Sequence, residues 1–153
     1  MKKLFALALS SLSLAAACGD EVHGQEACDA VSATATPLTA GTSSAAAAAV
    51  TASATPYDIT LPAGAAGYLK LSNAADTAYL VAFKSTGVLA GITQNGTAVT
   101  YGAPEALDAC ASDIKAHHDL DLEVVGDYVI RVGPVAGDKA WMYLDVDAGH
   151  EHE

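Results

Sequence analysis

The sequence predicts an all-β protein: a single antiparallel β-sandwich, of the jelly-roll type, with about eight or nine strands. Two observations carry this prediction. Apolar and polar residues alternate with a period of two over much of the chain after Tyr57, and turn residues, mainly Gly, Pro and Asn, separate the alternating runs. Asn95-Gly96 lies between two such runs, and Asn-Gly is a strong signal for a tight hairpin.

The expected elements follow one another along the chain. Residues 29–56 are rich in Ala, Ser and Thr. There we expect a strand near 30–37, a loop near 38–46 and a strand near 47–53, with a short helix over 44–50 as the competing interpretation. A helical turn is expected only near 104–114. The clearer strands are predicted at 57–61, 69–71, 78–83, 88–93, 97–101, 120–124, 128–132 and 141–147.

The N-terminus has the layout of a secretory signal peptide. Lys2 and Lys3 precede an apolar stretch that is too short to span a membrane, and small residues follow it. Leu14-Ala15-Ala16-Ala17-Cys18 resembles the lipobox of bacterial lipoproteins, in which the Cys is lipidated and becomes the new N-terminus. Ordinary cleavage that leaves Cys18 free is the alternative. The expected organisation is a signal peptide at 1–17, a lipidated acidic tether at 18–28, the β-sandwich at 29–147 and a His/Glu tail at 148–153.

Lipidation of Cys18 would anchor the protein in the cell envelope, facing the periplasm or the exterior. Gly19 follows the cysteine, where an Asp would suggest inner-membrane retention, so the outer membrane is favoured. The processed chain would carry five basic and 18 acidic residues, a net charge near −13. That charge argues against nucleic acid as a partner and against electrostatic docking on anionic lipid, and it favours solubility and cationic partners such as metal ions.

The other two cysteines are Cys28 and Cys110. In an oxidising compartment two thiols have one possible pairing, which would close a loop of 82 residues. A thiolate metal site that uses both cysteines is the alternative.

Two resemblances can be stated from short motifs. Residues 126–132, Gly-Asp-Tyr-Val-Ile-Arg-Val, and 57–64, Tyr-Asp-Ile-Thr-Leu-Pro-Ala-Gly, resemble strands of pre-peptidase C-terminal-like domains, which implies a β-sandwich. The whole layout resembles small His-bearing lipoproteins of myxobacteria, which implies metal binding. The residues that carry this second resemblance are Cys28, Cys110, Lys115–His118, Gly126–Pro134 and His150–Glu153, although Asp29-Ala30 stands where those proteins have a His.

The five histidines occur at three places, and imidazole is the commonest protein ligand for Zn and also suits Cu. His23 lies in the expected tether, and the tail carries His150, Glu151 and His152. Such a tail could hold one ion with both imidazoles and a carboxylate, or it could be only a solvated polar end.

His117 and His118 form the middle group. On a strand over 117–124, His118 would share the core face with Leu120, Leu122 and Val124, and His117 would share the outer face with Asp119, Asp121 and Glu123. His118 is then either a ligand or a rim histidine that is hydrogen-bonded to a loop, and the acidic row is either a ligand set or a solvated face. We slightly prefer the structural interpretation for both.

The sequence contains no Gly-x-Ser-x-Gly, no His-Glu-x-x-His and no phosphate-binding glycine loop, so we do not expect an enzyme. We expect a membrane-anchored extracytoplasmic lipoprotein that binds Zn or Cu through its His and carboxylate groups. The alternative is an envelope-surface β-sandwich that binds a protein or a glycan, or is structural, without a metal.

Overall fold

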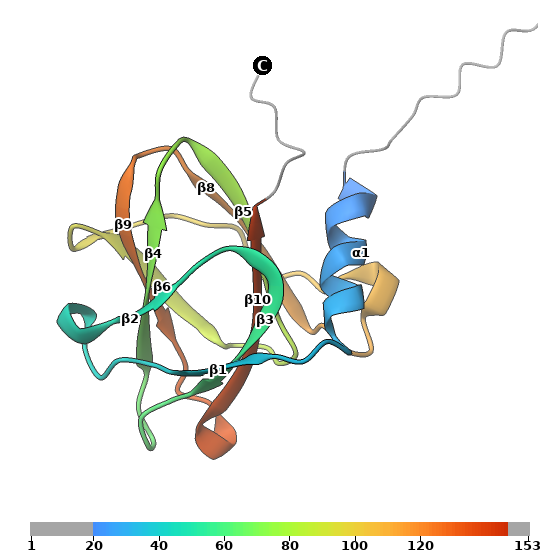
Figure 1. The fold of residues 1–153 in the computed structure, drawn as a ribbon, viewed down its shortest axis with the longest axis horizontal. Coiled ribbons are helices and arrows are strands. Elements are labelled where there is room, and N and C mark those ends of the chain that lie inside the picture. Colours follow the sequence, from blue (N-terminus) through green and yellow to red (C-terminus); the bar gives the residue numbers. More distant parts are fainter. Residues whose placement is uncertain (1–19, 147–153) are drawn as a thin grey trace, which may run out of the picture.

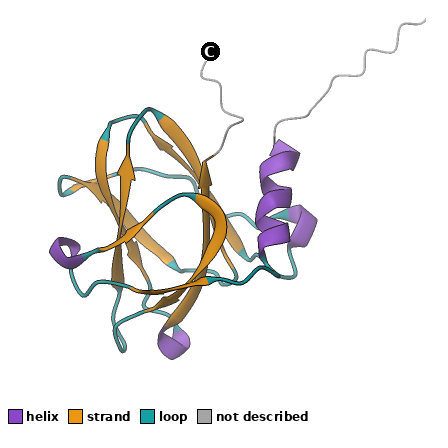
Figure 2. Ribbon diagram, viewed as in Figure 1, coloured by secondary structure: helices purple, strands orange, loops and turns teal. Residues whose placement is uncertain are grey.

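The period-two pattern of the sequence produces two β-sheets that pack face to face (Figure 1). The computed structural model describes residues 20–146, and within this range it contains ten strands, one α-helix and three short 3₁₀ helices. Figure 2 shows the helical segments at the periphery of the strands. The predicted all-β sandwich is therefore confirmed.

Each sheet has five strands. The first sheet has the order β1-β3-β10-β5-β8, and the second has the order β2-β4-β9-β6-β7. The strands of the first sheet are β1 (Thr36–Thr39), β3 (Ser53–Thr60), β10 (Lys139–Val146), β5 (Thr77–Phe83) and β8 (Ala116–Leu122). Those of the second are β2 (Ala48–Val50), β4 (Gly67–Asn73), β9 (Gly126–Val132), β6 (Leu89–Gln94) and β7 (Thr97–Ala98).

The sheets are mixed rather than purely antiparallel, which corrects one part of the prediction. β1 pairs parallel to β3, and β2 pairs parallel to β4, while all other pairs are antiparallel. The cause is the path of the N-terminal segment. Along the chain, β2 comes between β1 and β3 but belongs to the second sheet. No tight hairpin therefore joins β1 to β3, and the crossover through the second sheet permits parallel pairing.

The main core lies between the two sheets. The inward side chains include Ile59, Phe83, Ile130 and Met142, all of which are fully buried. Every residue from Ala78 to Phe83 on β5 is buried, and not only the inward ones. This continuous apolar run has a simple explanation, because a second hydrophobic cluster covers the outer face of the strand.

The second cluster is formed by helix α1 (Asp20–Ala30), which covers the outer face of the first sheet (Figure 1). This segment was predicted to be a tether, and the structure shows instead a packed helix. Its buried side is made of Gly24, Ala27 and Ala30, spaced three residues apart on one helical face. These small residues allow close approach to Leu80 and Tyr143 of the sheet.

Other boundaries also differ from the expectations. The strand expected near 30–37 is wrong over most of that range because α1 runs to Ala30 and β1 starts only at Thr36. A 3₁₀ turn, η1 (Ser44–Ala46), occupies part of the range 44–50, where a short helix was the competing interpretation. β2 covers part of the strand that was expected near 47–53. The Asn-Gly hairpin is confirmed: Asn95 and Gly96 both have positive φ between β6 and β7. The expected turn near 104–114 contains the 3₁₀ helix η2 (Asp108–Cys110), and the last one, η3 (Ala136–Asp138), precedes β10.

Asn73 links the two sheets at the end where β4 and β8 finish. Its Nδ2 donates to the carbonyl oxygens of Leu122, at 2.7 Å, and Val124, at 3.3 Å, and its Oδ1 accepts from the Tyr79 hydroxyl at 2.9 Å. β8 ends at Leu122, and Val124, predicted to face the core, is 56% exposed in the loop that follows. The carbonyl groups of this turn therefore bond to a side chain instead of continuing the strand.

The predicted disulfide between Cys28 and Cys110 is confirmed. It joins the last turn of α1 to η2, with 5.7 Å between the two Cα atoms and a sequence separation of 82. Within residues 20–146 no helix is long and apolar enough to cross a bilayer.

Removal of the disulfide should destabilise the protein. For a loop of 82 residues, the Cys28→Ala/Cys110→Ala variant is expected to lose about 4 kcal/mol of unfolding free energy, because the unfolded chain gains conformational freedom. Urea denaturation followed by circular dichroism measures the loss. The Cys18→Ala variant is the control and should unfold like the parent; an unchanged midpoint for the double variant would contradict the prediction.

Candidate functional site

His118 is a buried histidine that contacts a loop. It lies on β8 opposite Val81 of β5, is 5% exposed, and packs edge-on against Phe83 and Tyr101. Its Nδ1 lies 3.2 Å from the carbonyl oxygen of Gly102. Because a carbonyl oxygen can only accept, Nδ1 must carry the proton. Burial lowers the pKa of His118 and the adjacent His117 lowers it further, against the opposing effects of the Gly102 bond and Asp119.

His117 points to the opposite face of β8, as predicted. It is half-buried, and its Nδ1 lies 2.8 Å from the carbonyl oxygen of Glu105, whose backbone also pairs with that of His117. This geometry again requires a proton on Nδ1. The two adjacent imidazoles therefore hold two successive parts of the 99–107 loop, and they do not converge on one point.

The outer face of β8 carries the expected acidic row, and Asp119 and Asp121 are exposed on it. Among the described residues no three His, Cys, Asp or Glu side chains lie close enough together to hold a metal ion. Cys28 and Cys110 are bonded to each other, so they do not provide the thiolates of the alternative metal site. Within the described residues, the middle of the chain thus holds separate polar groups and not a cluster that could bind a metal.

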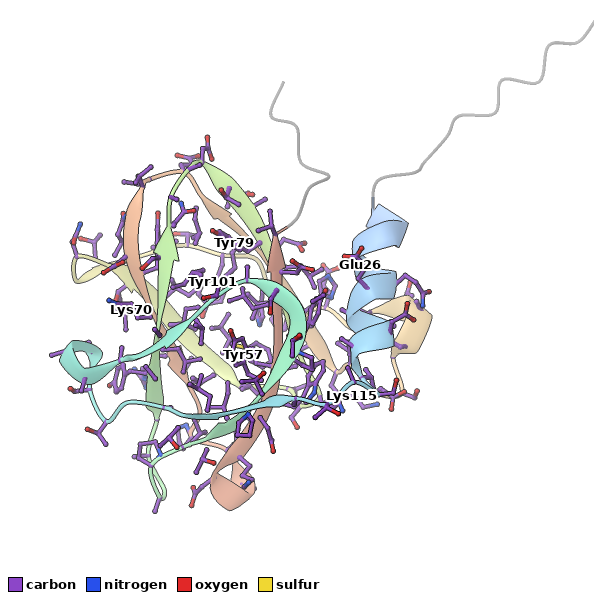
Figure 3. All side chains as sticks on the ribbon, in the orientation of Figure 1. Glu26, Tyr57, Lys70, Tyr79, Tyr101 and Lys115 are labelled. Carbon is purple, nitrogen blue, oxygen red and sulfur yellow. A yellow bond between two sulfur atoms is a disulfide. The ribbon has the colours of Figure 1, made fainter. Side chains whose placement is uncertain are left out.

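An acidic cleft lies between α1 and the outer face of the first sheet, where β3 begins and β10 ends. Glu26 and Asp29 of α1 and Tyr143 and Asp145 of β10 line this cleft of about 510 Å³. Figure 3 shows Glu26 on α1 beside the sandwich. These carboxylates could not be recognised as a group from the sequence, because their convergence depends on a helix that was not predicted. The alternation of Tyr143 and Asp145 with buried residues was the only local signal.

Asp145 is held in a fixed orientation in this cleft. Its Oδ2 accepts from the Tyr143 hydroxyl at 2.7 Å, and its Oδ1 accepts from the Val146 backbone amide at 2.8 Å. Burial raises the pKa of Tyr143, and the Asp145 hydrogen bond and the charges of Asp145 and Glu26 raise it further. Tyr143 therefore stays a neutral donor, and each Asp145 oxygen keeps a further lone pair for another partner.

The remaining predicted site residues lie near the two ends of the chain, and most of them are outside the range that the structure describes. Cys18, His150, Glu151 and His152 lie outside it, and His23 belongs to the first half of α1. β10 ends at Val146, at the end of the sandwich where α1 begins (Figure 1). β5 separates β10 from β8, so the tail leaves the sheet about 10 Å, or two strand spacings, from the strand that carries His117 and His118.

Comparisons with known proteins give no assignment: no protein-family model matches the chain, and no curated protein matches it significantly. The resemblances to pre-peptidase C-terminal-like domains and to His-bearing lipoproteins therefore stay predictions.

The buried site of His118 predicts a pH-dependent stability. Its pKa is lowered in the folded state, so below the ordinary value of about 6.5 the unfolded chain binds the proton more readily. The unfolding free energy should therefore fall as the pH drops from about 7.5 to about 5.5. Denaturant titrations at each pH measure this, and the His118→Gln variant should show a weaker dependence than the parent. An NMR titration that gives His118 a pKa of 6.5 or more would contradict the assignment.

Proposed function

We propose that this protein is a lipid-anchored, non-catalytic protein of the cell envelope that binds a divalent transition metal, Zn²⁺ or Cu²⁺, at the end of the sandwich where α1 begins and β10 ends. One observation carries the proposal. The His/Glu tail continues from Val146, directly after Asp145, and Asp145 shares the acidic cleft with Glu26 of α1.

Chain length makes this meeting feasible. His150 follows Val146 by four residues, and an extended chain spans up to about 3.5 Å per residue, so its imidazole can reach groups within about 14 Å of the end of β10. Asp145 is the adjacent side chain, and Glu26 lies across the same cleft. Two imidazoles with one carboxylate make a ligand set that suits Zn²⁺ or Cu²⁺.

The orientation of Asp145 supports the same site. Carboxylates that bind metals are commonly fixed by hydrogen bonds from a second layer of groups. Tyr143 and the Val146 amide supply such bonds here. His117 and His118 are not part of the proposed site, since the Nδ1 of each bonds to a carbonyl oxygen of the 99–107 loop, and their strand, β8, lies beyond β5. His23 remains a candidate because it belongs to the same helix as Glu26.

The proposed lipid anchor would place this site beside the membrane. Cys18 precedes the first residue of α1, Asp20, by two positions, which spans at most about 7 Å. The end of the sandwich at which α1 begins would then face the bilayer. The lack of enzyme motifs in the sequence favours a binding role over a catalytic one.

Metal binding can be tested by isothermal titration calorimetry of the full chain with Zn²⁺ and with Cu²⁺. The His150→Ala/His152→Ala variant should bind at least about tenfold more weakly, and Asp145→Asn should also weaken binding. Affinity should fall as the pH drops through about 6.5, because protonated imidazole cannot bind a metal. His117→Ala is the matched control and should bind like the parent. Absence of heat with both metals, or an equal loss in His117→Ala and the tail variant, would overturn the proposed site.

Lipid attachment has its own test. In bacterial cells fed labelled palmitate, the parent chain should carry the label and sediment with the membranes, and Cys18→Ser should lose both properties. Ser13→Ala keeps the cysteine and should behave like the parent. A parent chain that stays unlabelled, or a Cys18→Ser chain that retains the label, would show that Cys18 is not the anchor.

A further inference from the structure

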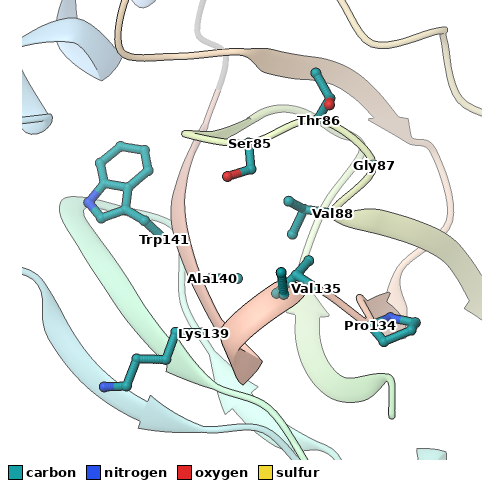
Figure 4. A pocket seen from close by; sticks show the side chains of 10 residues that line it. Ser85, Thr86, Gly87, Val88, Pro134, Val135, Lys139, Ala140 and Trp141 are labelled. Carbon is teal, nitrogen blue, oxygen red and sulfur yellow. The ribbon is translucent and has the colours of Figure 1, made fainter. Parts of the chain in front are cut away.

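A second cleft lies at the other end of β10, away from the start of α1. It has a volume of about 370 Å³ and is bounded by the turn after β5, the loop after β9 and the first residues of β10. Figure 4 shows Trp141 and Lys139 on one side and Thr86, Val88 and Val135 on the other. The cleft therefore combines an aromatic ring, an apolar surface, a hydroxyl group and a cation.

The indole of Trp141 is fixed in place. The Lys84 ammonium group lies over the ring, 4.6 Å from its centroid, and donates a hydrogen bond to the Val31 carbonyl oxygen at 3.0 Å. Trp141 is half-buried, so one part of the ring packs on the protein while another lines the cleft. A rigid, partly exposed aromatic surface beside Val135, which is also half-buried, suits the C–H face of a flat ring.

The residues that line this cleft carry a different charge from the protein as a whole, although Asp58 pairs with Trp141 across the strands and Asp138 precedes Lys139. The chain has a net charge of −11, yet no carboxylate lines the cleft, while Lys139 lines it and Lys84 stacks on Trp141. Of the five cations in residues 20–146, one thus lines this cleft and another stacks on the aromatic ring that lines it. Lys70, in contrast, pairs with Asp127 at 3.3 Å. The local positive charge favours a ligand with a negative group.

The hydroxyl groups at the rim are available for a ligand. Ser85 and Thr86 are exposed in the turn after β5, and neither side chain hydrogen-bonds to another part of the described chain. A hydroxyl can both donate and accept, so the pair can bond to ring hydroxyls of a ligand.

We propose that this cleft binds an acidic saccharide, a sugar ring that carries a carboxylate. The ring would pack its C–H face against Trp141 and Val135, its hydroxyls would bond to Ser85 and Thr86, and its carboxylate would pair with Lys139. The ring accounts for the aromatic and apolar surface, and the carboxylate accounts for Lys139. An acidic peptide would use the lysine alone.

The test uses the full chain in a polyoxyethylene detergent, which carries no sugar. Trp141 is the single tryptophan of the chain, so its fluorescence reports on the cleft alone. Titration with an α-1,4-linked galacturonate trimer should give a saturable change. Maltotriose, a neutral trimer, and triglutamate, an acidic peptide, should each bind at least about tenfold more weakly, because each lacks one of the two recognised features.

Charge reversal provides the second measurement. Lys139→Glu should weaken binding of the galacturonate trimer by about tenfold or more, since it replaces an attractive contact with a repulsive one. Lys70→Glu makes the same change at a lysine of β4, in the second sheet, and should bind like the parent. No saturable signal at millimolar trimer, equal binding of triglutamate, or equal behaviour of the two variants would overturn the proposal.

Discussion

The attachment of α1 to the outer face of the first sheet is the constraint on which both candidate sites depend. The Cys28–Cys110 disulfide and the small residues Gly24, Ala27 and Ala30 hold the helix there. Once the helix is in place, Glu26 lies across the acidic cleft from Asp145. The Val31 carbonyl oxygen, just after the helix, accepts a hydrogen bond from Lys84, and the Lys84 ammonium group in turn packs over the Trp141 ring. Without the helix, the outer face of β5 would be exposed apolar surface, the acidic cleft would lose one wall, and Lys84 would lose its contact beside the helix.

β10 connects the two sites because side chains alternate along it. Lys139, Trp141, Tyr143 and Asp145 belong to one series of alternate positions, while Ala140, Met142 and Leu144 belong to the other and pack in the main core. Lys139 and Asp145 are six residues apart, which corresponds to about 20 Å along a strand. One strand therefore presents a cationic, aromatic end and an acidic end. With the proposed anchor beside the start of α1, the acidic end would face the bilayer and the aromatic end would face away from it.

The sequence predicts those elements whose signal is local. The buried run of β5, the Asn-Gly hairpin and the opposite orientations of His117 and His118 follow from a period of two, and all are observed. α1 could not be recognised because its buried stripe consists of Gly and Ala, which do not stand out in a polar segment. The parallel pairing of β1 with β3, and of β2 with β4, depends on a crossover between sheets. The exposure of Val124 depends on Asn73, a residue about 50 positions away. Both clefts are likewise formed by segments that are distant in sequence.

The buried polar groups sharpen the interpretation of the histidines. Asn73 and His118 are the buried polar residues of the described chain, and both bond to loop carbonyl oxygens rather than to each other. No buried side-chain nitrogen or oxygen within residues 20–146 lacks a hydrogen-bond partner. His117 bonds to a loop carbonyl in the same manner. The Nδ1 atoms of the two central histidines are thus already used by the fold, and a metal at His118 would have to enter the core between Phe83 and Tyr101. The histidines left for the proposed metal site are therefore His23 of α1 and the tail residues His150 and His152, which follow Asp145 and its oriented carboxylate in sequence.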